Sequence, residues 1–233
     1  MFKTKPSRRA LASKPVRGPS RAEPGTAERI LDAAEKLFAA SGYDGVSLRA
    51  ITAEAGVELA LANYHFGPKL DLFRAVVRRR AEALNAERLA LLRALGADAP
   101  IEALIHAFTA PFLEKSARGG AGWKNYARLI AQTANSPRWT RDIMAAEFDP
   151  VAQAFIERVR ALYPRARDDD IYWSFHFLVG AITITFAETG RVELLSGGRC
   201  KARDLDAIHA RMIPFLAAGF RALCADGDRP RFR

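Results

Sequence analysis

Apolar residues recur three or four positions apart along most of the chain, and no stretch shows the sustained alternation that is typical of half-buried strands. The first such segment carries its apolar side chains on one face, at Ile30, Leu31, Ala34, Leu37 and Phe38. This pattern predicts an amphipathic helix that Thr26 caps at its start and that ends at Gly42.

Two short helices are predicted next. Ser47 is a suitable N-cap for a helix that carries Ile51 inward and stops at Gly56. Another begins near Glu58 and is broken by Gly67-Pro68. A glycine suits the turn between the two helices, because it adopts backbone angles that other residues resist.

A long helix over about 69–95 follows, and we expect the Arg78-Arg79-Arg80 run within it to be exposed charge. Five further helical patterns cover the rest of the chain, at about 101–117, 122–134, 138–162, 168–189 and 204–224. The chain is therefore predicted to be all-α.

Composition divides the ends from the middle. The chain has 233 residues and a net charge of +10, and much of the positive excess precedes the first acid, Glu23. A segment so rich in Lys, Arg, Pro and Ser cannot form a packed core, so we expect a disordered basic tail over 1–23. A flexible tail is also expected over 226–233. The basic tail favours a polyanion such as nucleic acid, and a merely solubilising extension is the alternative.

The sequence shows no signal for a membrane segment, secretion, a disulfide, a metal or a cofactor. No apolar run approaches the ~20 residues that span a bilayer, and the N-terminus lacks the apolar region of a secretory signal. We therefore expect a cytoplasmic protein without a membrane partner. Cys200 and Cys224 form no CxxC pair, which favours reduced thiols over a disulfide. No metal and no cofactor are expected, because the histidines are scattered along the chain.

The three N-terminal helices have the outline of a helix-turn-helix, in which the third helix enters the major groove. Three apolar side chains are spaced to pack that helix on the first two, at Val57, Ala62 and Phe66. Asn63 would then face outward, where it can pair with a base edge, while Tyr64 and His65 can reach phosphates. On spacing alone, three ordinary core helices are an equal alternative.

Five short motifs follow one another through the same region. They are Thr26-Ala-Glu-Arg-Ile-Leu-Asp-Ala-Ala, Phe38 with Ser41-Gly42-Tyr43, Ser47-Leu-Arg-Ala-Ile, Gly56-Val57, and Tyr64-His65-Phe66 with Lys69. Together they resemble the DNA-binding domain of the TetR family of transcriptional regulators over residues 26–77. The resemblance implies an N-terminal three-helix helix-turn-helix domain over 24–84 and a ligand-sensing and dimerisation domain over 85–225.

The resemblance also implies which residues contact DNA. Five become candidates for phosphate contacts, namely Ser47, Arg49, Tyr64, His65 and Lys69. Three become candidates for contacts to base edges, namely Leu59, Ala60 and Asn63. The run Leu59–Gly67 departs from many members and is more similar to the PsrA-like subgroup, which responds to fatty acids. Base preference therefore does not carry over from other branches.

The last two long helices point to a second copy of the chain. The segment 168–189 is apolar on nearly every side, and such a helix must be buried all round. The helix at 204–224 is apolar on two sides and contains Pro214, which should kink it. In the TetR family such helices form an intermolecular four-helix bundle, which implies a homodimer that reads a palindromic DNA operator. A self-contained helical core is the alternative.

The middle helices are rich in aromatic residues, as expected of an apolar pocket for a small-molecule effector. The pocket candidates are Phe108, Phe112, Tyr126, Ile130, Phe148, Phe155, His176 and Phe177. For each of them an ordinary core position is the alternative, and His176 in particular is expected to be a core histidine. Similarity to the PsrA-like subgroup implies a fatty acid or acyl thioester as the effector.

The leading hypothesis is a repressor that a ligand releases from its operator. An enzyme is the alternative from another class, but the chain has no HExxH, no GxSxG and no glycine-rich phosphate loop. A helical interaction protein that has lost DNA binding is a third option, and the intact 47–69 segment argues against it.

Overall fold

The computed structural model describes residues 25–225, and the predicted tails over 1–23 and 226–233 lie outside the described residues. Within residues 25–225 every regular element is helical, which confirms the all-α class. None of the helices in this range combines the length and the apolar character needed to cross a membrane.

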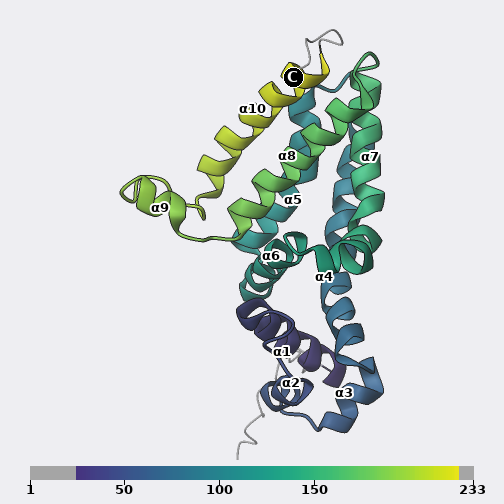
Figure 1. The fold of residues 1–233 in the computed structure, drawn as a ribbon, viewed down its shortest axis with the longest axis vertical. Coiled ribbons are helices and arrows are strands. Elements are labelled where there is room, and N and C mark those ends of the chain that lie inside the picture. Colours follow the sequence, from purple (N-terminus) through teal and green to yellow (C-terminus); the bar gives the residue numbers. More distant parts are fainter. Residues whose placement is uncertain (1–24, 226–233) are drawn as a thin grey trace, which may run out of the picture.

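The first three helices form a small N-terminal lobe at one end of the molecule (Figure 1). They are α1 (Thr26–Ser41), α2 (Leu48–Ala55) and α3 (Leu59–Phe66). The next helix, α4 (Lys69–Ala94), starts in this lobe and runs into the larger part of the molecule (Figure 1). Since α4 is one uninterrupted helix, it links the two parts directly.

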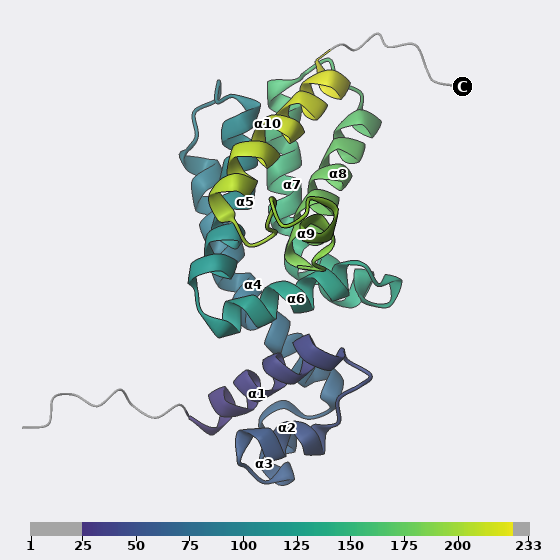
Figure 2. The same cartoon turned by 90° about the vertical axis from the view of Figure 1, so that its left-hand side faces the viewer.

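The larger part, here called the C-terminal body, consists of the second half of α4 together with the later helices. They are α5 (Ile101–Arg118), α6 (Ala121–Ala134), α7 (Ala146–Leu162), α8 (Asp168–Phe186), α9 (Arg191–Leu195) and α10 (Leu205–Cys224). α6 lies across the end of the body that faces the N-terminal lobe, and it packs on α1 (Figure 2). α9 projects to the side of α8 and α10 (Figure 1).

Two of the predicted helix caps have different outcomes. Ser47 caps α2 as predicted, because its hydroxyl accepts a hydrogen bond from the Ala50 amide at 3.1 Å. The prediction for Thr26 is wrong, since Gly25 is the residue before α1 and Thr26 is already helical. No side chain caps that end of the helix.

The predicted helix over 138–162 is not continuous. A 3-10 turn (Pro137–Trp139) and a π-helical segment (Thr140–Ala145) precede α7. The turn places the Trp139 ring against the N-terminal lobe, with its centroid 5.0 Å from those of Tyr43 and Phe73. Burial of this large ring accounts for the departure from a simple helix.

A further helix, α9, was not predicted, and α8 ends at Phe186 instead of continuing to 189. α9 has only five residues, too few for an apolar repeat to be visible. Cys200 is exposed before α10, and Cys224 is buried at its far end, with its sulfur 3.7 Å from the Ser174 hydroxyl. A helix of this length is about 30 Å long, so no disulfide joins the two cysteines.

Candidate functional site

The third helix is seated on the N-terminal lobe by a tight turn and a small buried side chain. Gly56 lies in the left-handed region at φ 63° and ψ 41°, and it ends α2. The Val57 amide then donates to the Thr52 carbonyl at 3.0 Å, which turns the chain into α3. Ala62 is completely buried, so α3 packs closely on its neighbours. The remaining faces of this short helix are left to solvent.

Most of the predicted DNA-contact residues lie on that solvent-facing surface. The exposed ones are Ser47, Arg49, Ala60, Asn63, Tyr64 and His65, and Leu59 is half-buried. Tyr64 is the most prominent, with 83% of its surface exposed. An exposed aromatic ring beside an exposed amide and an imidazole matches the side chains that proteins use on phosphates and base edges.

Lys69 has a different environment from the other predicted contact residues. Its ammonium donates to the carbonyls of Tyr43 and Val46, both at 2.9 Å, and lies 4.1 Å from the centre of the Tyr43 ring. It therefore connects the start of α4 to the loop between α1 and α2. An ammonium has three donors, so one remains for a phosphate, and that contact stays a prediction.

The expectation of an exposed arginine run in α4 is wrong for two of its three members. Arg79 and Arg80 both pair with Glu35 of α1, a carboxylate that is almost fully buried, at 3.0 and 2.5 Å. Arg79 also reaches Asp32 at 2.8 Å. Only Arg78 is mainly exposed. The two arginines are largely covered between α1 and α4, because the buried carboxylate of Glu35 needs positive partners.

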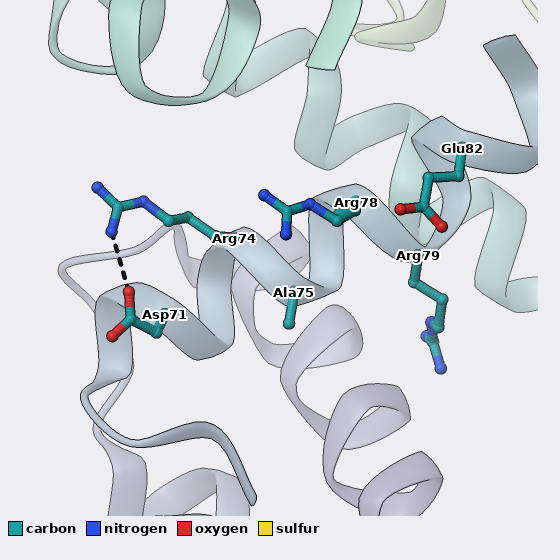
Figure 3. Close-up of a pocket in the computed structure, with 6 residues that line it drawn as sticks. All are labelled: Asp71, Arg74, Ala75, Arg78, Arg79 and Glu82. Atoms are coloured by element: carbon teal, nitrogen blue, oxygen red, sulfur yellow. Dashed lines mark hydrogen bonds and ion pairs between the residues drawn. The ribbon is translucent and has the colours of Figure 1, made fainter. Parts of the chain in front are cut away.

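Figure 3 shows the outer face of α4, where six side chains line a shallow pocket of about 420 Å³. They are Asp71, Arg74, Ala75, Arg78, Arg79 and Glu82. Arg74 turns back to Asp71 at 2.9 Å, whereas Arg79 points away from Arg74 and Arg78 (Figure 3). Most of the lining groups form ion pairs with neighbouring charges. We therefore interpret this depression as an ordinary solvated helix face and not as a ligand site.

Further contacts connect the N-terminal lobe to α6 and the segment after it. The Gln132 amide donates to the Ala39 carbonyl at 3.1 Å, and Arg138 holds both oxygens of Asp44 at 3.0 and 2.9 Å. The Arg80 guanidinium lies 5.0 Å from the Trp123 ring. We call this set of contacts, together with the Glu35 ion pairs, the junction. It gives α6 and α4 a direct mechanical connection to α1.

Most of the predicted pocket residues meet in one aromatic core of the C-terminal body. Phe108, Phe112, Tyr126, Ile130 and Phe155 are buried, and Phe148 is half-buried. The Phe108 and Phe155 ring centroids are 5.1 Å apart, and those of Phe112 and Tyr126 are 5.8 Å apart. The structure therefore brings these residues together, with their rings packed on one another.

His176 and Phe177 do not belong to that core. Both are exposed on the outer face of α8, and Phe177 has 55% of its surface exposed. α8 instead turns Ser174 and Leu178 inward, and of the three residues between them Phe175 is half-buried while His176 and Phe177 are exposed. The prediction of a core histidine at 176 is wrong, because a helix that is apolar all round does not reveal which side its own chain covers.

One buried residue in the core was missed at the level of sequence. Arg88 of α4 has 4% of its surface exposed, its Nε donates to the Phe108 carbonyl at 2.7 Å, and its guanidinium lies 4.4 Å from the Phe108 ring. Burial lowers the pKa of Arg88 to about 10, so the group is still charged at neutral pH. A signal was present, since Arg88 lies four residues from Leu84 and from Leu92 on the apolar face of α4.

An exposed short helix packed on two others, beside a separate helical body, is the arrangement found in helix-turn-helix DNA-binding proteins. Comparison with family models agrees: residues 30–76 match "Bacterial regulatory proteins, tetR family", and residues 106–219 match "Tetracyclin repressor-like, C-terminal domain". The chain belongs to the TetR family of transcriptional regulators. The resemblance seen in the N-terminal motifs is confirmed at this level.

Individual relatives are more distant. The regulator BetI from Agrobacterium fabrum is 33% identical over 85 residues, which is 36% of this chain and 41% of BetI. The matched segment spans less than half the length of the curated relatives that it matches. A TetR-like regulator from Rhodococcus sp. RHA1 superposes with a TM-score of 0.61 at 20% identity, covering 90% of this chain and all of that one.

Another solved structure is the regulator FadR from Bacillus subtilis in complex with stearoyl-CoA. It superposes with a TM-score of 0.56 at 13% identity and covers 82% of this chain and 97% of that chain. At such identities the likeness establishes the shared fold, and the ligand belongs to that protein.

Proposed function

We propose that this protein is a cytoplasmic, ligand-controlled repressor. In this proposal a homodimer binds a palindromic double-stranded DNA operator through α3, and a small apolar effector in the C-terminal body releases it. The DNA-binding domain would cover 24–84 and the sensing and dimerisation domain 85–225. The observation that carries the proposal is the position of α4, which starts beside α3 and lines the aromatic core with Arg88.

The dimer is supported by an apolar face that the chain leaves uncovered. Trp173, Phe177 and Ile184 are exposed along one side of α8, with Gly180 between them, and Phe215 of α10 is 75% exposed. Large exposed side chains in such an arrangement mark a surface that associates with a partner. Since α8 and α10 are adjacent, two-fold pairing of this face would assemble four helices.

The uncovered face continues onto α9, and we include α9 in the proposed interface. Leu194 and Leu195 of α9 are strongly exposed, and a groove of about 700 Å³ separates α9 from α8 and α10. Ile184 and Phe215 line that groove as well as the face described above. Because the groove and the face share these residues, a second copy of the chain would cover both.

The junction offers a physical route from effector to DNA. α6 carries Tyr126 in the aromatic core and, within a few residues, Trp123 and Gln132 at the contact with the N-terminal lobe. A shift of α6 or α4 that accompanies binding would therefore move α1, and α3 with it. Two recognition helices whose spacing changes in this way no longer match both half-sites.

A fatty acid or acyl thioester is the effector that we propose first. The aromatic core is apolar, as expected of a pocket for an acyl chain. Similarity to the PsrA-like subgroup points the same way, and the solved FadR relative binds stearoyl-CoA.

The proposal is tested by the binding of DNA from upstream of the protein's own gene, measured by fluorescence anisotropy over a range of salt concentrations. Replacing Asn63 and Tyr64 together by alanine should weaken binding roughly 10- to 100-fold. Arg49→Ala should reduce the salt dependence by about one phosphate contact. Arg128→Ala is the control, since it removes the same charge from an exposed site on α6. Unchanged binding by the double variant would overturn the assignment of α3.

A further inference from the structure

A charged group is buried in the aromatic core without a charged partner. The Arg88 guanidinium has five N–H donors, and only Nε makes a hydrogen bond to another group within residues 25–225, to the Phe108 carbonyl at 2.7 Å. No carboxylate of the described chain forms an ion pair with it. Aromatic faces at 4.4 Å (Phe108) and 5.6 Å (Phe112) offset part of the charge. The other N–H donors of the group are left for something else.

A second donor lies in the same core. The hydroxyl of Tyr126 is buried and has no hydrogen-bond partner among the described residues. Burial raises the pKa of Tyr126, so the group is a neutral phenol that can donate its proton. A buried hydroxyl in this state is unfavourable, and a suitable acceptor would relieve that penalty.

Both donors border the same ring. The Arg88 guanidinium lies 5.6 Å from the centre of the Phe112 ring, and the Tyr126 ring centroid lies 5.8 Å from it. Arg88 belongs to α4 and Tyr126 to α6, so the pair bridges two helices of the junction. Phe112 is therefore the side chain whose movement would open one space to both donors.

The acids in the neighbourhood are already engaged. Glu35 pairs with Arg79 and Arg80, and Glu147 pairs with Arg78 at 3.0 Å. Neither is available to compensate Arg88. A buried cation without an anionic partner is unfavourable, so an anion that reaches it gains both charge compensation and hydrogen bonds.

We propose that Arg88 and Tyr126 bind the carboxylate of an apolar acid, whose hydrocarbon tail lies among the rings of Phe108, Phe155 and Phe175. This inference rests on the proposed function, in which the C-terminal body senses an effector, and it narrows that effector to a free acid. A thioester is neutral at its acyl end and would leave Arg88 uncompensated. A carboxylate supplies the charge and can accept from the guanidinium and the phenol together.

The neighbouring rings are apolar, and they would have to move apart to admit a hydrocarbon tail. Phe108 contacts Phe155 and Phe175 with centroids 5.1 and 5.7 Å apart, so apolar surface extends from the carboxylate site. Tyr126 is three residues from Trp123, which touches Arg80 of the junction. An acid that binds both Arg88 and Tyr126 would thus draw α4 and α6 together, and both helices contact α1 through the junction.

The test is thermal unfolding of the full-length protein titrated with octanoate, with methyl octanoate and with acetate. Octanoate should raise Tm by about 5–10 °C at roughly 100 times its Kd, whereas the uncharged ester and the tailless acetate should not. Tyr126→Phe should weaken octanoate binding about tenfold or more, and Arg88→Met should abolish the preference for acid over ester. Arg88→Lys, which keeps the charge, should retain part of the preference.

Arg158→Met is the matched control. Arg158 also donates to backbone carbonyls in the body, those of Leu92 and Leu95, but its site is partly exposed. Its loss should lower Tm without changing the preference for acid. If Arg88 serves only to connect α4 to α5, Arg88→Met should behave in the same way, and the proposal is then wrong.

The remaining outcomes of the titration also decide whether the carboxylate site exists. An ester that stabilises as well as the acid overturns the carboxylate site, an equal response to acetate means an adventitious ion only, and no response to octanoate excludes a simple apolar acid. Operator binding by the wild-type protein is measured in the same titration. Acid binding without operator release would contradict the proposed function and leave the Arg88–Tyr126 site standing.

Discussion

The N-terminal lobe and the C-terminal body treat their polar and apolar groups in opposite ways. In the lobe, Ser47 caps α2 and Lys69 donates to two carbonyls, while the surface of α3 is exposed. In the body, Arg88 and Tyr126 are buried with unused donors, and large apolar side chains such as Phe177 are exposed. The polar groups named in the lobe are hydrogen-bonded or exposed to solvent. The body, in contrast, has buried donors without acceptors and apolar side chains without a covering surface.

This difference suits the two regions to different partners, DNA for the lobe and a second chain or a ligand for the body. A surface that is polar and fully folded can bind and release DNA without refolding. In the proposed function the uncovered apolar face pairs with a second copy of the chain, and the buried unpaired donors receive a ligand in the core. The variants below test these assignments, and the largest effect is expected at the uncovered face.

The largest effect is expected from Phe177→Arg combined with Phe215→Arg. Two charges on the exposed face of α8 and α10 would have to be desolvated in a dimer, which costs several kcal/mol. Sedimentation should show a monomer, and operator affinity should fall more than about 100-fold because one half-site remains. Leu91→Arg, at an exposed apolar position on α4, is the control. A dimer of undiminished strength would mean that the chain covers this face in another way.

Loss of Glu35 should have the next largest effect. Glu35→Ala leaves Arg79 and Arg80 without their shared partner, and breaking such a buried ion pair costs about 3 kcal/mol. Thermal unfolding should show a fall of roughly 6–12 °C in Tm. It should also weaken the response of operator binding to effector, because the junction is cut.

Glu28→Ala provides the comparison for Glu35. Glu28 also bonds to Arg79, at 3.2 Å, but its side chain is 58% exposed. Exposed ion pairs contribute about 0–1 kcal/mol, so this variant should unfold close to the wild-type temperature. Equal effects of the two substitutions would show that the junction is an ordinary surface network.

A smaller and more local effect is expected in the lobe. Ser47→Ala removes the hydroxyl that caps α2 and should cost about 1 kcal/mol, seen as a decrease of about 2–4 °C in Tm. Thr26→Ala should stay within about 0.5 kcal/mol of wild type, because Thr26 makes no cap. A matching loss in both variants would contradict the cap assignment. Chemical denaturation monitored by circular dichroism gives both values.

The same contrast between lobe and body explains which features could be predicted from the sequence and which could not. In the lobe, Ser47, Gly56 and Ala62 each have a local meaning, as cap, turn and close contact, and each has that role in the structure. In the body, the burial of Arg88 and the exposure of His176 depend on which helices pack against them, and a repeat within one helix does not contain that information. The interruption at Trp139 is of the same kind, since it follows from contact with a distant ring.

The predicted DNA-contact residues are intermediate between these two cases. Motifs from Ser47 to His65 identified them as candidates, and most of these candidates are exposed in the structure. Lys69 belongs to the same motif set, yet its ammonium is held by backbone carbonyls. A motif therefore identifies candidate residues in this domain, while the structure is needed to separate the exposed candidates from those that hold the lobe together.

The smallest effect is expected from His209, a half-buried side chain of the C-terminal body whose Nε2 atom is covered. Its Nε2 has no hydrogen-bond partner within the described chain, and burial, together with nearby His106, lowers the pKa of His209 although Glu114 and Asp206 oppose this. The unfolded chain then binds a proton more readily than the folded protein does. Stability is therefore complete above the ordinary histidine pKa of ~6.5 and decreases as the pH falls through that value.

The expected loss is a few tenths of a kcal/mol, because solvent screens this partly covered ring. Urea denaturation at about pH 7.5 and about pH 5.5 should show it, and His209→Gln should reduce the difference. His65→Gln, at an exposed position on α3 outside the proposed interface, should leave the difference unchanged. If both substitutions had the same effect, burial of His209 would not be the cause of the pH dependence of stability. The contrast between buried and exposed polar groups would then not extend to this residue.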